Sequence, residues 1–364
     1  MIMAGGTGGH VFPALAVAEV LRQRGLAVVW LGTRQGLEAQ RVPAEGFTVE
    51  WIQVRGLRGT SWKRWATAPW MVGRATLQAA VALGRHRPRV AIGMGGFVSG
   101  PGGLAARALG IPLLIHEQNA RAGTTNRWLA PLAHEVLAGF PAAFPPGRRV
   151  QVVGNPVRAA IAALPPPEER FAQRTGPLRL LVLGGSQGAL ALNEALPAAL
   201  APLPAHLRPV VVHQTGAKGL EITRAAYAAA AVEADTSAFI DDMAAAYAWA
   251  DLVVSRAGAL TVAELAAAGV GAILVPYPHA TDDHQRHNAQ FLLDAGAARL
   301  LPQEKLGPAV LAAELAELLA DRATALALAA KARRCATIDG ATAIADRALA
   351  LAGLNPLHPG VTTP

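Results

Sequence analysis

The stretch MAGGTGGHVFPALAVA, residues 3–18, places a glycine-rich turn directly before a run of small apolar residues. The glycines do not follow the G-x-G-x-x-G spacing in any register, which excludes a standard dinucleotide-binding turn. Apolar residues recur at helical spacing from Ala14 to Leu21, Pro13 suits a first helical turn and Gly25 suits a helix end. We therefore predict a helix over 13–25, followed by a buried strand in LAVVWLG, residues 26–32.

The same alternation of apolar strand and helical stretch continues along the chain. Further strands are predicted within 89–96, 111–119, 134–139 and 149–155, before LPPPEERFAQRTGP (164–177) interrupts the pattern. It restarts at LRLLVLGGSQGALALNEAL (178–196), with strands expected within 209–216, 251–258 and 271–277. Alternation of this kind is typical of parallel sheets covered on both faces. We predict an α/β protein of two doubly wound, Rossmann-like domains, residues 1–155 and 156–340, that face a ligand cleft. A last helix is expected over 341–352, and the sequence leaves open on which of the two domains it packs.

Composition narrows the class of protein. The chain has 364 residues, of which 52% are hydrophobic and 16% charged, as expected of a two-domain globular protein. The single cysteine, Cys335, excludes a disulfide framework and fits a reducing cytoplasm. We find no signal peptide and no apolar run of the ~20 residues that a membrane span needs, so we do not expect an integral membrane protein.

The formal charge of +8 is unevenly distributed. No Asp or Glu occurs between Trp51 and His116, a segment rich in arginine and tryptophan. Such a segment attracts anionic lipid, nucleic acid or a phosphorylated substrate, or is simply a solvated basic face.

Three glycine-rich turns, at 5–10, 93–103 and 184–189, each follow an apolar strand. Glycine lets backbone approach a ligand, and a helix that begins there directs N–H groups at an anion, so the three together favour phosphate or sugar binding. Glu264 has two interpretations: a capping box with Thr261, or a carboxylate for a ribose diol. The histidines and aspartates of 279–289 lack metalloprotease spacing, and no D-x-D occurs, so we expect no metal.

Seven motifs together carry a family resemblance: GGTGGHVFPALAVA, HEQNARAGTTNRWLA, VGNPVR, LGGSQGALALN, FIDDM, SRAGALTVAELAAAG and DDHQRHNA. In this order and at about this spacing, from residue 3 to about 350, the chain resembles the MurG family of peptidoglycan glycosyltransferases. The resemblance implies a GT-B fold and transfer of N-acetylglucosamine from UDP-N-acetylglucosamine to lipid I, undecaprenyl-diphospho-muramoyl-pentapeptide, forming lipid II. It implies no cofactor, no nucleic-acid partner, and a peripheral position on the cytoplasmic face of the membrane.

The resemblance also assigns candidate binding residues. Thr7, Gly8, Gly9 and Asn119 would face the sugar and acceptor, and Arg158 and Ser186 the diphosphate. Ile240 would bind uracil and Glu264 the ribose. The remaining candidates are Ala259, Leu260 and Thr261 beside the nucleotide, and Gln285 at the N-acetylglucosamine hydroxyls.

The implied reaction is a single displacement with inversion at the anomeric carbon. The attacking sugar hydroxyl needs a base, for which His10 is our first choice and Glu117 our second. A membrane-anchored acceptor gives the basic segment a role, and we expect Trp62, Lys63, Arg64, Trp65 and Trp70 to form a patch that binds anionic lipid. Two alternatives are a UDP-N-acetylglucosamine epimerase of the same fold and a non-catalytic nucleic-acid or membrane binder.

Overall fold

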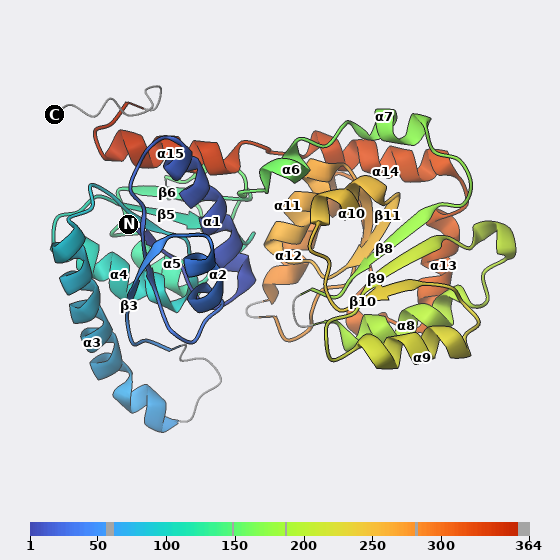
Figure 1. The fold of residues 1–364 in the computed structure, drawn as a ribbon, viewed down its shortest axis with the longest axis horizontal. Coiled ribbons are helices and arrows are strands. Elements are labelled where there is room, and N and C mark those ends of the chain that lie inside the picture. Colours follow the sequence, from blue (N-terminus) through green and yellow to red (C-terminus); the bar gives the residue numbers. More distant parts are fainter. Residues whose placement is uncertain (56–61, 148, 186–187, 281–282, 356–364) are drawn as a thin grey trace. The chain divides into compact units, whose positions relative to one another are not determined.

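The computed structural model describes residues 1–55, 62–147, 149–185, 188–280 and 283–355, without the side chains of 62–67. The chain divides into two compact units (Figure 1). The N-terminal unit comprises Met1–Pro156 and the segment from Asp339 onward, and the C-terminal unit comprises Val157–Ile338.

The N-terminal unit contains a seven-stranded parallel sheet in the order β3-β2-β1-β4-β5-β6-β7. The strands are β1 (Ile2–Met3), β2 (Val29–Gly32), β3 (Thr48–Trp51), β4 (Ala91–Gly93), β5 (Leu113–Glu117), β6 (Glu135–Ala138) and β7 (Gln151–Val152). The helices are α1 (Gly8–Gln23), α2 (Glu38–Ala44), α3 (Trp62–His86), α4 (Gly96–Ala108), α5 (Thr124–Leu129) and α15 (Gly340–Leu351). The order reverses between β1 and β4, and ligands of doubly wound sheets bind at such a switch point.

The C-terminal unit repeats this plan with a six-stranded parallel sheet in the order β10-β9-β8-β11-β12-β13. The strands are β8 (Arg179–Leu183), β9 (Val210–Gln214), β10 (Asp235–Ser237), β11 (Leu252–Ser255), β12 (Gly271–Leu274) and β13 (Ala298–Leu300). The helices are α6 (Ala159–Ala162), α7 (Pro167–Ala172), α8 (Leu190–Leu200), α9 (Leu220–Ala229), α10 (Met243–Trp249), α11 (Ala259–Ala268), α12 (His284–Asp294), α13 (Pro308–Leu318) and α14 (Arg322–Arg334). Here the switch point lies between β8 and β11, beside the third glycine turn.

Helix α15 brings the end of the chain back to the N-terminal unit. Its buried residues Ile344, Ala345 and Ala348 share a core with residues of α1, beside which it lies (Figure 1). An ion pair between Arg347 and Glu135 joins the helix to β6. The helix expected over 341–352 therefore packs on the N-terminal unit.

Helix α1 differs from the prediction at its start. It begins at Gly8, five residues earlier than expected, and Pro13 lies inside it and is buried. The carbonyl oxygen of Thr7 accepts hydrogen bonds from the N–H groups of His10 and Val11, so the first turn closes before Pro13 is reached. The helix gives up the one bond that an N–H at position 13 would donate to Gly9. The glycine turn and the helix thus overlap instead of following one another.

Within the described ranges, no helix is both long and apolar enough to cross a membrane.

Candidate functional site

The first glycine turn lies at the carboxyl end of β1, against the turn that follows β4. A Cβ atom on Gly96 would lie 2.2 Å from the carbonyl oxygen of Gly5, so the two backbones touch and only glycine fits. A Cβ on Gly5 would lie 2.5 Å from Oε1 of Glu38. By contrast, a Cβ on Gly9 would meet nothing closer than Thr7 Oγ1, at 3.7 Å. Packing therefore requires glycine at 5 and 96, whereas a Cβ at Gly9 would make only ordinary van der Waals contact.

Glu38 holds this turn in place and was not foreseen from the sequence. Its carboxylate is fully buried and accepts three hydrogen bonds: from Gly6 N at 2.9 Å, from Thr33 N at 3.0 Å and from Thr33 Oγ1 at 2.8 Å. A buried carboxylate is tolerated where donors of this kind replace its hydration. Glu38 ties the loop after β1 to the loop after β2, and its only sequence signal was a glutamate at the start of a helix.

His10, the candidate base, is the third residue of α1 and is half-buried. Its Nδ1 lies 3.3 Å from the hydroxyl oxygen of Thr7. The ring covers Gly95, on which a Cβ would lie 2.5 Å from Cδ2 of His10, and Gly95 has a φ of +89°, which favours glycine. The imidazole is thus held between the glycine turns that follow β1 and β4.

Glu117, the second candidate base, is almost completely buried at the end of β5. One oxygen accepts from the backbone and side-chain N–H groups of Asn119 at 2.9 and 3.1 Å. The other accepts from Gly123 N at 3.0 Å and from Asn126 Nδ2 at 2.9 Å. Four donors saturate the carboxylate, which shapes the loop that carries Asn119.

His116 anchors the same motif from inside the sheet. It is fully buried, with Nε2 3.0 Å from the carbonyl oxygen of Gly154 and Nδ1 3.2 Å from Nε2 of Gln118. Because the Gln118 amide donates to Nδ1, Nε2 carries the proton and donates to Gly154. Burial lowers the pKa of His116 from 6.5 to about 4, so the ring is neutral at neutral pH. His116, Glu117 and Gln118 are thus all buried and hydrogen-bonded within the N-terminal unit.

In the C-terminal unit, Arg158 and Glu264 form an ion pair, although the family resemblance assigns them to different parts of the ligand. Arg158 donates from Nε and Nη2 to Oε1 of Glu264 at 3.0 and 2.8 Å, and Tyr247 donates to Oε2 at 3.3 Å. Burial raises the pKa of Glu264, and Arg158 opposes that shift. Gly258 is the N-cap of α11, and Thr261 is its third residue. The capping-box interpretation of Glu264 is therefore wrong, because the helix starts too early, and Glu264 lies in the second turn.

The other described candidates of this unit gather at the carboxyl edge of the sheet. Ala259, Leu260 and Thr261 form the first turn of α11, whose leading N–H groups have no partner within the helix. Ile240 is half-buried in the loop between β10 and α10. Gln285, in the first turn of α12, accepts from Tyr277 N at 2.9 Å. Ser186, Trp62, Lys63, Arg64 and Trp65 lie outside the residues whose side chains are described.

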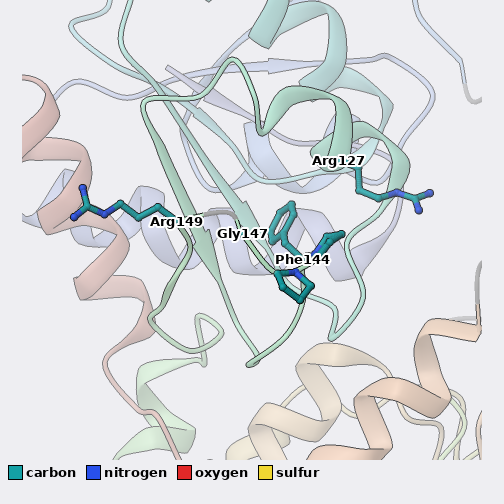
Figure 2. Close-up of a pocket in the computed structure, with 6 residues that line it drawn as sticks. Arg127, Phe144, Gly147 and Arg149 are labelled. Atoms are coloured by element: carbon teal, nitrogen blue, oxygen red, sulfur yellow. The ribbon is translucent and has the colours of Figure 1, made fainter.

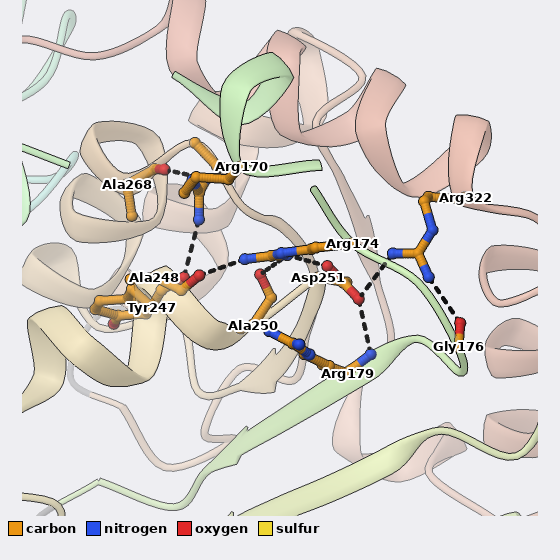
Figure 3. Close-up of polar contacts among 11 residues, drawn as sticks. Arg170, Arg174, Gly176, Arg179, Tyr247, Ala248, Ala250, Asp251, Ala268 and Arg322 are labelled. Atoms are coloured by element: carbon orange, nitrogen blue, oxygen red, sulfur yellow. Dashed lines mark hydrogen bonds and ion pairs between the residues drawn. The ribbon is translucent and has the colours of Figure 1, made fainter. Parts of the chain in front are cut away.

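A second polar cluster occupies the opposite edge of this sheet (Figure 3). Asp251, immediately before β11, is buried and paired with Arg174 and Arg322, and it accepts a hydrogen bond from Arg179 N at 2.9 Å. Arg170 donates to the last carbonyls of α11 and to Tyr247 O. Guanidinium groups at helix carboxyl ends are stabilising, so this cluster fastens the 164–177 segment and is structural.

A cavity of about 430 Å³ in the N-terminal unit is lined by Arg127, Phe144, Pro145, Pro146, Gly147 and Arg149. None of these was a candidate, and the Arg127 and Arg149 side chains extend in opposite directions (Figure 2). They do not converge on one ligand, so this cavity is not part of the candidate site. In the described ranges no group of three His, Cys, Asp or Glu side chains is placed to hold a metal ion.

Comparisons with known proteins agree with this architecture. Residues 1–138 match the N-terminal domain of glycosyltransferase family 28, and residues 179–347 match its C-terminal domain. A protein of Nitrosococcus oceani is 56% identical over 97% of this chain and 98% of its own length. One of Acidithiobacillus ferrooxidans is 54% identical over the same shares. Both are named UDP-N-acetylglucosamine--N-acetylmuramyl-(pentapeptide) pyrophosphoryl-undecaprenol N-acetylglucosamine transferase.

Solved structures give the same result. The crystal structure of Acinetobacter baumannii MurG is 42% identical, with a TM-score of 0.84, over 96% of this chain and 99% of that chain. The calicheamicin glycosyltransferase CalG4, 19% identical with a TM-score of 0.67 over 97% of both chains, shows a common fold alone. The predicted α/β class with two doubly wound domains is confirmed, and so is the family resemblance. This chain belongs to the MurG family of glycosyltransferases, within glycosyltransferase family 28.

Proposed function

We propose that this chain transfers N-acetylglucosamine from UDP-N-acetylglucosamine to the muramoyl 4-hydroxyl of lipid I, producing lipid II. The observation that carries this proposal is the 56% identity, over 97% of the chain, to a transferase whose name states this donor and this acceptor. An epimerase is not favoured, because the named relatives are transferases with a lipid-linked acceptor.

The C-terminal unit supplies suitable groups for the donor. Glu264 is a buried carboxylate at the carboxyl edge of the sheet, suited to accept from ribose hydroxyls. Its partner Arg158 has a half-exposed guanidinium, suited with Ser186 and the start of α11 to the diphosphate. In this proposal Ile240 binds uracil through its backbone, and Gln285 binds the hexosamine through the amide N–H groups.

The N-terminal unit supplies the base. In the proposed step the 4-hydroxyl oxygen forms a bond to the anomeric carbon while the bond to the diphosphate oxygen breaks. UDP leaves with that electron pair, the configuration inverts, and the hydroxyl proton passes to the imidazole of His10. The geometry favours His10 over Glu117, since the Glu117 carboxylate is buried and holds four hydrogen bonds. Thr7, Gly8 and Gly9 border the space where the acceptor would lie.

Transfer of labelled N-acetylglucosamine to a short-chain lipid I analogue tests the function. We expect His10→Ala to lower turnover at least ~100-fold, the usual contribution of a general base, with UDP affinity unchanged. His206→Ala, at an exposed position of the C-terminal unit, is the matched control. Near-normal turnover in His10→Ala would remove His10 from this role. Wild-type protein that epimerises the donor without acceptor, and transfers nothing, would overturn the proposed function.

Helix α3 is proposed to bring the protein to the cytoplasmic leaflet. Trp70, Leu77 and Val81 are 67%, 70% and 62% exposed, and their spacing of seven and four residues puts them on one helical face. The Arg74 guanidinium lies 5.6 Å from the centre of the Trp70 ring. An exposed apolar stripe beside arginine suits the interface of an anionic bilayer. Trp62, Lys63, Arg64 and Trp65 belong to the start of the same helix and are proposed to take part in the same membrane contact.

Sedimentation with vesicles that contain anionic lipid tests the membrane face. We expect the double variant Trp70→Ser, Leu77→Ser to bind at least ~10-fold more weakly, because two large apolar side chains no longer enter the bilayer. Lys63→Glu with Arg64→Glu should weaken binding further. The control is Ile222→Ser, which removes an equally exposed apolar side chain, 59% exposed, from the C-terminal unit. Unchanged binding of the double variant would contradict the assignment.

A further inference from the structure

Gln214 is the last residue of β9 and is only 5% exposed. Its side-chain oxygen accepts a hydrogen bond from Gly185 N at 3.0 Å. Its side-chain nitrogen donates to Gly185 O at 3.1 Å and to Ala238 O at 3.0 Å. The acceptor faces an N–H group and both donors face carbonyls, so these partners fix the orientation of the amide.

These bonds join two turns that belong to different βα units. Gly185 lies in the glycine turn after β8, one residue before Ser186, a proposed diphosphate ligand. Ala238 lies in the loop after β10, two residues before Ile240, the proposed uracil contact. The two turns are about 50 residues apart in the sequence, so no local segment of the chain connects them. Gln214 spans them with one side chain.

The bridging side chain is itself held on a rigid base. Strand β9 lies between β8 and β10, with Gln214 paired to Leu183 on one side and to Ser237 on the other. The neighbouring His213 is fully buried, with its ring nitrogens 3.0 Å from Tyr227 Oη and 3.1 Å from Asn193 Oδ1. Interior strands of this kind position a side chain far better than a loop does.

We propose that Gln214 is a positioning residue that fixes the span between the diphosphate turn and the uracil segment, so that both ends of a uridine diphosphate bind at once. This inference rests on the proposed function, since it needs a nucleotide donor at this edge. A ligand held at two places gains the full contribution of both only if their separation matches its own length. Without the side chain of Gln214, each turn keeps its own contacts with the ligand, but the distance between the two turns is no longer fixed.

The test compares the affinities of UDP and uridine by calorimetry. Gln214→Leu removes all three side-chain hydrogen bonds, whereas Gln214→Glu keeps the acceptor for Gly185 N and sets an oxygen against two carbonyls. We expect the ratio of uridine to UDP dissociation constants to fall at least ~10-fold in both variants. In the transfer assay the KM for the donor should rise while kcat and the acceptor KM stay within about twofold. Gln173→Leu, at an exposed glutamine of the same unit, is the control and should match wild type.

The outcomes separate this inference from the function on which it rests. Wild-type protein that binds no UDP would overturn the proposed function. Wild-type protein that binds UDP, with a folded Gln214→Leu or Gln214→Glu variant that keeps the wild-type ratio, would overturn the role of Gln214. A purely structural role lowers the unfolding temperature and leaves the ratio unchanged. If Gln214→Leu does not fold, Gln214→Glu decides, because it preserves the volume of the side chain.

Discussion

Acidification should destabilise each unit through one buried histidine. His116 in the N-terminal unit and His213 in the C-terminal unit are fully buried, and burial lowers the pKa of each from 6.5 to about 4. The folded pKa lies below the unfolded one, so between these values the unfolded chain binds more protons. The contribution of each neutral ring is complete above about pH 6.5 and is lost as the pH falls towards 4.

The magnitude follows from proton linkage. With a pKa of 6.5 unfolded and about 4 folded, each histidine costs about 2 kcal/mol of unfolding free energy between about pH 7.5 and pH 5. Glu264 acts in the opposite direction, because its pKa is raised and its protonation favours the folded state. The decisive quantity is therefore the difference between wild type and a variant without the histidine, since the Glu264 effect cancels in it.

Urea unfolding followed by circular dichroism at the two pH values measures this difference. His213→Gln should be less stable than wild type at pH 7.5, since it perturbs the bonds to Tyr227 and Asn193, yet it should lose about 2 kcal/mol less on acidification. His206→Gln, at an exposed position, should retain the wild-type pH dependence. If His213→Gln loses as much stability as wild type, the buried ring does not remain neutral in the folded protein, and the reasoning fails.

Two further substitutions test packing, each by thermal and urea unfolding. Gly96→Ala should destabilise the N-terminal unit by about 3 kcal/mol, because its Cβ would lie 2.2 Å from Gly5 O at a φ of +77°; a loss below about 1 kcal/mol would show that the two turns can separate. Asp251→Asn should cost the C-terminal unit about 3–5 kcal/mol, because Arg174 would keep a buried charge without its partner. Retention of wild-type stability there would mean that the carbonyl oxygens around Arg174 suffice.

Interior strands were predictable from the sequence, and most edge strands were not. Strands β2, β4, β5, β8 and β11 appear as apolar runs, since parallel strands inside a sheet are covered on both faces. Strands β3, β10 and β13 lie at sheet edges and are short and partly polar, as DTS in β10 shows. Such short runs carry only a weak signal in the sequence, and pairing with a neighbouring strand stabilises them.

The glycine turns of the site were predictable from the sequence, whereas the buried side chains that hold these turns in place were not. The turn at 5–10 was evident, but Glu38, which fills the space beside Gly5, lies more than 30 residues downstream. In the sequence, Gln214 cannot be told from any other residue at the end of a strand. Its role is visible only in the fold, which brings the two turns that it joins next to each other. The pairing of Arg158 with Glu264 likewise depends on packing between α6 and α11. Long-range partners of this kind come from topology, and local patterns do not encode them.

The return of α15 to the N-terminal unit sets an order for synthesis on the ribosome. Residues 157–338 are contiguous, so this half can mature as soon as it clears the exit tunnel. The other half must wait, since Ile344 and Leu349 complete a core that includes Val17 and Ala18 near the opposite end of the chain. Until α15 has emerged, Val17 and Ala18 lack these apolar partners, and chaperones should engage the incomplete core.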